Sequence, residues 1–307
     1  MFADLIQSRV SATSSVLCAG FDPDLRMIPS FAREIAEKKD TQEEYLFTAL
    51  FSTYSAAVEV LEPLVACVKP NAAFFEQYGV GGYRALQQIS LLCKREKVPV
   101  ILDAKRGDIA SSAQAYANAY LEPLEARGEA IEIIHADALT VNPFLGFETI
   151  SPFISACIRK GKGLFVLVKT SNPGSRDIQD RAVGDSAETI SQKIAKVIDA
   201  EGSRVVGQSG ISSIGAVIGA THPEEARQLR ALMPRALFLV PGFGAQGGSA
   251  AEARAGQIPE SALGSGMGIL VNMSRGLFQI DPSLSRTEWL HELATRARAA
   301  NEQLAAD

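Results

Sequence analysis

Short apolar runs recur along this chain of 307 residues, and a helix-compatible segment follows most of them. The runs cover residues 15–20, 64–68, 98–102, 138–141, 163–168, 215–219, 236–240 and 268–272. Apolar runs without polar alternation suit a parallel sheet that is buried on both faces. Eight such strands alternating with helices, in one chain of this length, predict an α/β fold of the (β/α)8 TIM-barrel type.

The alternative arrangement of the same elements is a doubly wound open sheet. No GxGxxG motif follows the first run, which counts against a dinucleotide-binding version of that fold. No linker or change of composition divides the chain, so we expect one barrel domain over residues 1–307, with flanking helices at about 1–13 and 287–300. A further helix is expected from Ile109 to near Arg127 and Gly128.

Charged residues crowd the end of the third run. Asp103 and Lys105 follow directly after Leu102, and Asp108 comes after a glycine where the chain can turn. Residues two apart on an extended chain point to the same side, so the Asp103 and Lys105 side chains are expected to lie together. A structural salt bridge that closes the strand is the plain alternative. Burying three charges is costly, however, and the carboxyl end of a buried strand is where α/β proteins place chemistry.

Two other runs also end in a charge: Asp22 follows the first, and Lys69 follows the second. Taken singly, Asp22 could be a turn residue and Lys69 a solvent-facing side chain. A barrel gathers its strand ends at one mouth, where these two residues would meet Asp103 and Lys105. Two unit charges about 4 Å apart interact by roughly 4 kcal/mol at an effective dielectric near 20. The lysines would therefore stay protonated and the acids ionised.

Such a charged cluster can carry out a decarboxylation without an electron-sink cofactor. A protonated lysine can donate a proton to carbon, and a fixed carboxylate can repel a substrate carboxylate and favour its loss. Both features fit a decarboxylation that passes through a carbanion.

The loops after the seventh and eighth runs indicate a phosphate site. Residues 241–248 include four glycines, which allow backbone N–H groups to approach an anion closely. Arg275 supplies a planar guanidinium that matches phosphate oxygens. In barrels these two loops frequently bind phosphate, although glycine turns and a surface arginine are the simpler explanation of each loop alone.

Composition narrows the class of protein further. The net charge is −5, which gives no electrostatic footprint for nucleic acid or an anionic membrane surface. The amino-terminal residues do not match a signal peptide, and the longest apolar runs are too short to span a bilayer. The histidines are scattered, and no Cys/His motif predicts a metal site. Four cysteines without a CxxC pair indicate reduced thiols, so we expect a cytoplasmic protein.

Four motifs in combination resemble the orotidine 5'-phosphate decarboxylase family in its longer bacterial form (type 2). The motifs are LDAKRGDI at 102–109, VKPNAAFFE at 68–76, VKTSNPGS at 168–175 and PGFGAQGG at 241–248. The resemblance covers nearly the whole chain, from Phe21 to Arg275. It implies the conversion of orotidine 5'-monophosphate (OMP) to UMP and CO2 in pyrimidine biosynthesis, without a cofactor or metal. It also implies a homodimer with shared active sites.

The resemblance assigns catalytic roles to four positions. Asp103, Lys105 and Lys69 would form the charged network, with Lys105 as the proton donor to C6 of the pyrimidine. Asp108 would reach the active site of the neighbouring subunit, and Ser112 would help it there.

The resemblance also assigns substrate contacts. Asp22 matches the ribose contact, with Asn71 a weaker candidate beside it, and Ser171 matches the residue that reads the pyrimidine edge. Gln246 and Arg275 match the phosphate grip. Two further polar residues face the predicted mouth without an assigned role; they are Thr140 and Asn142. Insertions at about 26–45 and 175–187 set this chain apart from shorter members, so their lid geometry does not carry over.

Two other functions stay open at this point. Sugar-phosphate decarboxylases and aldolases of the same suprafamily bind Mg²⁺, and they place an acid where this chain has Lys69. A lysine there would oppose a divalent cation, and sensitivity to EDTA would separate the two classes. A non-catalytic sensor of nucleotide phosphates is the second alternative. It would need no proton donor, so the complete Asp/Lys set argues against it.

Overall fold

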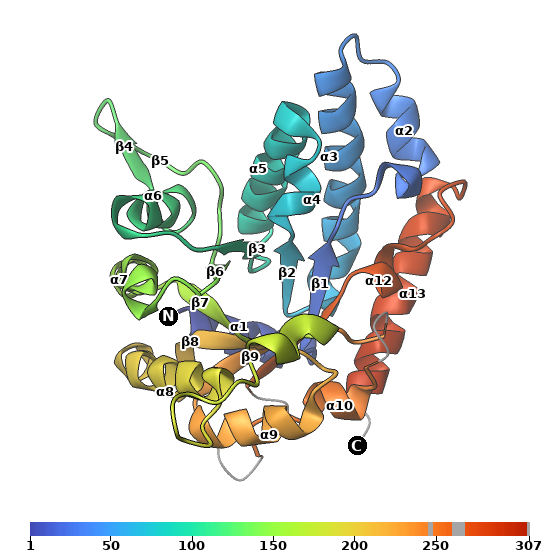
Figure 1. Cartoon of the computed structure of the whole chain (residues 1–307). Coiled ribbons are helices and arrows are strands. Elements are labelled where there is room, and N and C mark those ends of the chain that lie inside the picture. Colours follow the sequence, from blue (N-terminus) through green and yellow to red (C-terminus); the bar gives the residue numbers. More distant parts are fainter. Residues whose placement is uncertain (245–247, 260–267, 306–307) are drawn as a thin grey trace.

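The computed structural model describes residues 1–244, 248–259 and 268–305, and its core is a nearly closed barrel of parallel strands surrounded by helices (Figure 1). The order around the barrel is β2-β1-β10-β9-β8-β7-β6-β3. The strands are β1 (Leu17–Phe21), β2 (Cys67–Pro70), β3 (Ile101–Arg106), β6 (Ala138–Val141), β7 (Gly163–Lys169), β8 (Ser212–Ile218), β9 (Ala236–Val240) and β10 (Ile269–Met273). The predicted (β/α)8 barrel is confirmed, and each expected strand overlaps an observed one.

The barrel closes between β2 and β3. Isolated parallel bridges join Val68 to Val100 and Asn71 to Asp103, and the Val68 N–H donates to the Pro99 carbonyl at 2.9 Å. This closure brings the carboxyl end of β2, with Lys69, beside that of β3, with Lys105, so the two predicted catalytic lysines come from neighbouring strands.

Helices follow most of the strands. They are α1 (Phe2–Thr13), α2 (Ser30–Ala36), α3 (Gln42–Leu61), α4 (Ala72–Glu76), α5 (Gly79–Arg95), α6 (Ala110–Tyr120), α7 (Ser151–Lys160), α8 (Ile190–Gly202), α9 (Pro223–Leu232), α10 (Ala250–Arg254), α12 (Arg275–Phe278) and α13 (Arg286–Ala305). Short 3-10 turns are η1 (Leu25–Met27), η2 (Glu62–Leu64), η3 (Phe147–Ile150), η4 (Pro173–Asp177) and η5 (Ser203–Val205). Both expected flanking helices are present as α1 and α13. In the described part of the chain, no helix has the length and apolar character needed to cross a membrane.

The helix expected to reach Arg127 and Gly128 was wrong in its carboxyl end. It is α6, and it stops at Tyr120, three residues before Pro123, because proline and the residue before it disfavour a continuing helix. The chain then forms an antiparallel hairpin of β4 (Leu124–Ala126) and β5 (Glu129–Ile131). Arg127 and Gly128 make its turn, with φ of 55° and 79°. The hairpin projects away from the barrel (Figure 1).

The core has two parts, one inside the barrel and one between the barrel and its helices. The inner part packs side chains from alternate positions of the strands, among them Cys18, Phe165 and Leu270. Phe2 of α1 contributes to the inner part and meets Phe165 edge to face, with ring centroids 5.9 Å apart. All four cysteines are buried and free. This packing makes the barrel a filled scaffold, so only its ends offer space for a ligand.

A buried arginine connects the elements that lead to the seventh and eighth strands. Arg230 of α9 donates to the carbonyls of Met233 and Ala236 at 2.9 and 2.6 Å, and to those of Gly256 and Gly268 at 2.7 and 2.8 Å. Its guanidinium also lies 3.7 Å from the centre of the Phe238 ring. The arginine therefore fixes where β9 and β10 begin, and through them the loops at their other ends.

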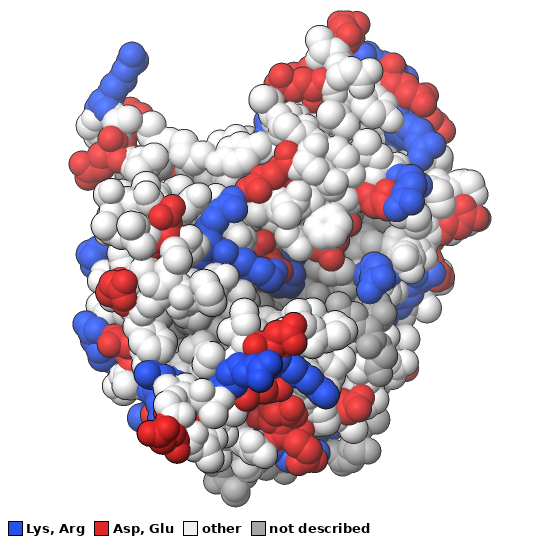
Figure 2. Space-filling view, viewed as in Figure 1, with Lys and Arg blue, Asp and Glu red and all other residues white. Residues whose placement is uncertain are grey.

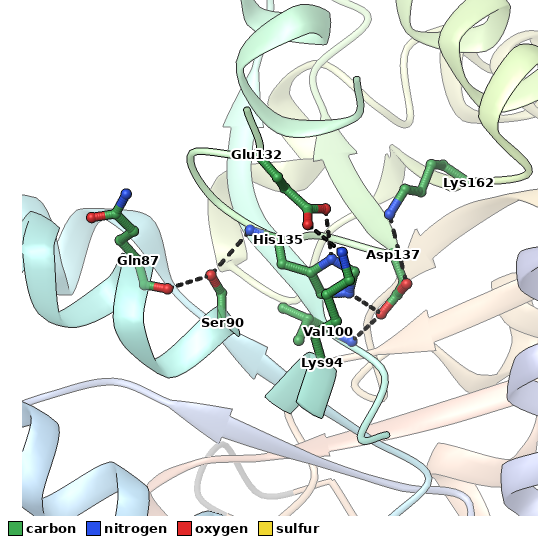
Figure 3. Close-up of polar contacts among 8 residues, drawn as sticks. All are labelled: Gln87, Ser90, Lys94, Val100, Glu132, His135, Asp137 and Lys162. Carbon is green, nitrogen blue, oxygen red and sulfur yellow. Dashed lines mark hydrogen bonds and ion pairs between the residues drawn. The ribbon is translucent and has the colours of Figure 1, made fainter. Parts of the chain in front are cut away.

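Figure 3 shows a polar network at the amino end of the barrel, opposite the predicted site. Its residues are Gln87, Ser90, Lys94, Val100, Glu132, His135, Asp137 and Lys162. His135 lies between two carboxylates: Nδ1 is 2.8 Å from Glu132 Oε1, and Nε2 is 3.2 Å from Asp137 Oδ2. Lys94 pairs with Glu132 at 2.5 Å, so the network connects α5 to the segment that leads into β6.

We expect Asp137→Asn to lower the free energy of unfolding near pH 7 by about 1–3 kcal/mol, because Asp137 accepts from the Val100 N–H and faces His135 and Lys162. Burial favours the neutral acid, but these partners hold the pKa of Asp137 below its ordinary value. The contribution of the Asp137 charge to the free energy of unfolding is therefore complete above the ordinary pKa of an aspartate, near 4, and is lost as the pH falls below that value. Urea unfolding would show a smaller difference in the free energy of unfolding between wild type and Asp137→Asn near pH 3.5 than near pH 7. A difference that is the same at both pH values would contradict the charge argument. Asp185→Asn, which removes an exposed carboxylate, is the control.

Candidate active site

A cavity of about 1040 Å³ opens at the carboxyl ends of the barrel strands and contains most of the predicted site. The predicted residues that line it are Asp22, Lys69, Asn71, Asp103, Lys105, Ser171 and Arg275. In Figure 2 the molecule is hollowed between the lobe of the β4–β5 hairpin and the lobe of α2 to α5, and acidic and basic side chains lie side by side below this hollow, near the middle of the view. A smaller hollow of about 630 Å³, between α2, α3, α5 and α13, contains none of the predicted residues.

Asp103 is the centre of the charged network. Its Oδ2 accepts from Lys69 Nζ at 2.6 Å, and its Oδ1 accepts from Lys105 Nζ at 2.6 Å and from the Thr140 hydroxyl at 2.9 Å. The Asp103 and Lys69 side chains are buried, whereas 48% of the Lys105 side chain is exposed to the cavity and solvent. Of the two lysines, Lys105 is the one that a substrate can reach from the mouth.

The surroundings fix the charges of the two buried groups. Burial by itself raises the pKa of the Asp103 carboxyl, but the charges and hydrogen bonds of Lys69 and Lys105 outweigh burial and hold this pKa well below its usual range. Burial lowers the pKa of Lys69, and the negative charges of Asp103 and then Asp22 raise it well above its ordinary value. At neutral pH the site therefore holds an ionised Asp103 next to a protonated Lys69.

The predicted same-side geometry of Asp103 and Lys105 is observed, although the strand is not regular there. The expected strand ended at Leu102, whereas β3 continues to Arg106 and therefore carries the charged residues itself. The pairing of β3 with β6 shifts register between Leu102 and Arg106. Lys105 has a φ of 47°, in the left-handed region that is uncommon for a long side chain and that costs of order 1–3 kcal/mol. Such strain is typical of functional positions.

Asp22 and Asn71 occupy the ends of β1 and β2. Asp22 follows β1 directly, and its Oδ1 is buried with no hydrogen-bond partner among the described residues. A buried acceptor without a partner favours a ligand that brings a donor, such as a hydroxyl group. Asn71 lies beside Asp103 through its parallel bridge, and its backbone N–H donates to the Phe21 carbonyl at 3.1 Å.

Ser171 is held in the cavity wall by the segment that follows β7. The fully buried Lys169 pairs with Asp180 at 2.5 Å, and Gln179 accepts from the Thr170 N–H at 2.9 Å, so residues 173–180 fold back over the strand end. A side chain at Gly219 would lie 2.8 Å from the Ser171 Cα, so the close approach of the β8 end requires glycine there. Sequence reasoning missed Gln179 and Asp180, because both lie inside a polar connection without a pattern.

The predicted phosphate side of the cavity is formed by the ends of β9 and β10. Pro241, Gly242 and Phe243 line it, and Gly242 has a φ of 101°, which suits glycine alone. Arg275 is exposed and lines the same cavity at the start of α12. Gln246, the other predicted phosphate contact, lies outside the described residues.

Asp108 and Ser112 do not line the cavity of their own chain. Asp108 lies in the loop after β3, where its Oδ1 accepts from the Ile109 N–H at 2.8 Å. Ser112 is exposed on α6.

No group of three or more His, Cys, Asp or Glu side chains among the described residues is arranged to hold a metal ion. The end of β2, where a metal-binding relative would carry an acid, holds Lys69, which donates to Asp103 at 2.6 Å. Among the described residues, the two charged side chains that pair with the Asp103 carboxylate are lysines, whose positive charge opposes a divalent cation there.

The fold and the site together define a class: a (β/α)8-barrel enzyme in which two lysines flank one ionised aspartate at the mouth. A model of the orotidine 5'-phosphate decarboxylase / HUMPS family matches residues 17–283. The chain is 40% identical over 277 residues to an orotidine 5'-phosphate decarboxylase from Caldicellulosiruptor bescii, covering 90% of this chain and 88% of the relative. The chain therefore belongs to the orotidine 5'-phosphate decarboxylase / HUMPS family.

Two further relatives extend over almost the whole chain. The orotidine 5'-phosphate decarboxylase from Rhodopirellula baltica is 37% identical over 309 residues, covering 99% of this chain and 98% of the relative. The solved structure of Leishmania donovani OMP decarboxylase is 30% identical, with a TM-score of 0.66, and the match covers 97% of this chain and 98% of that one. The similarity thus includes the full barrel and every strand that contributes to the site.

Proposed function

We propose that this protein converts orotidine 5'-monophosphate to UMP and CO2 by a cofactor-free decarboxylation. One observation carries the proposal: the ionised Asp103 is held at 2.6 Å by each of two lysines at the mouth of the barrel. The names of the relatives, which are orotidine 5'-phosphate decarboxylases, support the same reaction. The metal-dependent sugar-phosphate chemistry of the same suprafamily is less favoured, because Lys69 stands where such an enzyme would need an acid.

The charged network suggests how the bond is broken. A substrate carboxylate beside Asp103 is repelled by its fixed negative charge, and the bond from C6 to the carboxylate carbon breaks with its electron pair left on C6. Lys105 then transfers a proton from Nζ to C6 as CO2 leaves, and it regains a proton from water. The Lys105 charge also stabilises the negative charge that develops on C6 in the transition state. Lys69 keeps Asp103 ionised and in place throughout.

Substrate contacts around the cavity would hold C6 near Lys105. We assign the ribose hydroxyls to Asp22, with Asn71 beside it, the pyrimidine edge to Ser171, and the phosphate to Arg275 and Gln246. The phosphate takes no part in the chemistry. Its binding energy can be used to bring the substrate carboxylate toward Asp103, which lowers the barrier rather than only tightening binding.

The assembly that we propose is a homodimer in which Asp108 and Ser112 of each chain serve the cavity of the other. Two observations support it: neither residue lines the cavity of its own chain, and large apolar side chains are exposed in the segments that follow the carboxyl ends of β2, β3 and β6. They are Phe74, Val80, Tyr83, Ile109, Phe144 and Leu145. Exposed apolar residues gathered on one face are typical of an interface.

Two further expectations belong to the same proposal. Four free buried thiols are consistent with a cytoplasmic enzyme, and a net charge of −5 is consistent with a partner that is a small molecule rather than nucleic acid. We also propose that residues 1–307 form one barrel domain.

The proposed function is tested by following the absorbance of OMP with the purified wild-type protein, with and without EDTA. We expect rapid conversion to UMP that EDTA does not slow. Conversion that requires Mg²⁺, or turnover of a sugar phosphate in place of OMP, would support the metal-dependent branch. Tight UMP binding by a folded protein that leaves OMP unchanged would support a nucleotide sensor. Either result would overturn the proposal.

A further inference from the structure

We propose that Thr140 is a positioning residue for the decarboxylation, because its hydroxyl group fixes the backbone of Lys105 and the carboxylate of Asp103 at the same time. The inference rests on the proposed function and adds a residue on a different strand, β6, to the machinery. It is supported by the two hydrogen bonds of the Thr140 hydroxyl, by the irregular pairing of β3 with β6 and by the positive φ of Lys105.

The first step concerns the backbone of β3. Its register with β6 is regular at Leu102↔Leu139, and the next pair is Arg106↔Val141. Three residues of β3 therefore face a single residue of β6, which is Thr140. A bulge of this kind takes backbone groups out of the ladder and re-aims side chains. The left-handed φ of 47° at Lys105 lies within this bulge.

The second step concerns the N–H group of Lys105. It donates to the Thr140 hydroxyl at 2.9 Å, so a side chain of the neighbouring strand supplies the acceptor. A buried backbone N–H without an acceptor would be unfavourable. The hydroxyl therefore stabilises the local conformation from which the Lys105 side chain starts.

The third step concerns the direction of the hydroxyl proton. Because the Thr140 oxygen accepts from the Lys105 N–H, its single proton is free to point to Asp103, and Oδ1 lies 2.9 Å away. The same Oδ1 accepts from Lys105 Nζ at 2.6 Å. One hydroxyl group thus contacts both the backbone of the proton donor and the carboxylate that orients its ammonium group. Thr140 is 1% exposed, so water does not readily replace it.

These contacts predict a specific effect on catalysis. Without the hydroxyl, the fold can remain, but Lys105 and Asp103 lose the atom that sets their relative position. Small displacements of a catalytic group affect the chemical step more than substrate binding. A hydrogen bond to a charged group corresponds to roughly a 10- to 100-fold change in rate.

The experiment compares Thr140→Val, which keeps the shape, with Thr140→Ser, which keeps the hydroxyl. We expect Thr140→Val to lower kcat by about 10- to 100-fold with KM changed by less than about threefold, and Thr140→Ser to recover most of kcat. Thr53→Val is the matched control, because Thr53 is also buried and donates to a carbonyl, that of Ala49 at 2.8 Å, within α3 and away from the cavity. It should lose stability without losing kcat. Circular dichroism and thermal unfolding check that each variant is folded, and Thr140→Ala replaces Thr140→Val if the latter does not fold.

The outcomes separate the two levels of the proposal. A wild-type protein without OMP turnover would overturn the proposed function, and this inference with it. An active wild type with a folded Thr140→Val or Thr140→Ala variant of equal kcat would overturn the inference alone. A loss of kcat that Thr140→Ser does not recover would show that the methyl packing matters rather than the hydroxyl, and would also overturn it.

Discussion

Lys105→Met is expected to lower kcat for OMP decarboxylation by at least about 10²–10⁴-fold, the usual contribution of a positioned general acid. The ammonium group of Lys105 donates to Asp103 Oδ1 at 2.6 Å and is the member of the network that is exposed to the cavity. Methionine keeps most of the length of the chain and removes the proton donor. A rapid absorbance assay with OMP, beside a measurement of UMP binding, would separate the loss of chemistry from a loss of affinity.

Lys94→Met is the matched control for this variant. Lys94 is similarly exposed, at 54%, and similarly paired with one carboxylate, Glu132 at 2.5 Å, but it lies at the amino end of the barrel (Figure 3). Its substitution should leave kcat within about twofold, since surface ion pairs contribute little to either stability or chemistry. Near-normal turnover by Lys105→Met would contradict the proton-donor assignment and would direct attention to Lys69.

The asymmetry between the two lysines follows from burial. Lys69 is 5% exposed in its side chain and donates to the other oxygen of Asp103, so it cannot approach a substrate without breaking that contact. We propose that Lys69 holds the carboxylate in the ionised form against burial, which by itself raises the pKa of Asp103. Lys105 can turn from Asp103 to a substrate atom, since half of its side chain already faces open space.

Much of this site could be predicted from the sequence because its charges directly follow apolar runs. A charge at the end of a buried strand has only the mouth of a barrel to occupy, which placed Asp22, Lys69, Asp103 and Lys105 correctly in one cavity. The parallel sheet could be predicted because eight runs without alternation suit a sheet that is covered on both faces, and the lack of a GxGxxG motif after the first run counted against the dinucleotide-binding form of the open alternative.

The parts that the sequence did not reveal depend on contacts between segments that carry no pattern. The role of Thr140 arises from a bulge in β3, and a bulge is set by pairing with a neighbouring strand rather than by local preference. The sequence predicts the end of a helix near Arg127 and Gly128, where the structure has the turn of a hairpin, because a glycine after a basic residue is also typical of a helix terminus. Helix α6 instead ends at Tyr120, shortly before Pro123. Asp108 needs a second chain for its predicted role, because it does not line the cavity of its own chain.

Arg275→Ala is expected to lower kcat/KM for OMP by about 10²–10⁴-fold, while the protein stays folded. The side chain is exposed and lines the cavity near Pro241 and Gly242, so its removal leaves no cavity in the core. A guanidinium that binds phosphate through two charge-assisted hydrogen bonds contributes about 1.5–3 kcal/mol for each. Arg275→Lys keeps the charge without the planar fork and should recover part of the loss.

Orotidine, the substrate without its phosphate, shows whether the loss of kcat/KM in Arg275→Ala comes from lost phosphate binding. If Arg275 binds the phosphate, wild type and Arg275→Ala should turn over orotidine at the same slow rate, because the group that the arginine binds is absent from both reactions. Equal losses on OMP and orotidine would show that Arg275 acts on the fold or on the charged network instead. Arg286→Ala, an exposed arginine of α13 that pairs with Glu59 outside this cavity, should leave both rates unchanged. A large loss of kcat/KM in Arg275→Ala on OMP, with no loss on orotidine, would mean that the binding energy of the phosphate lowers the barrier at C6, on the far side of the substrate.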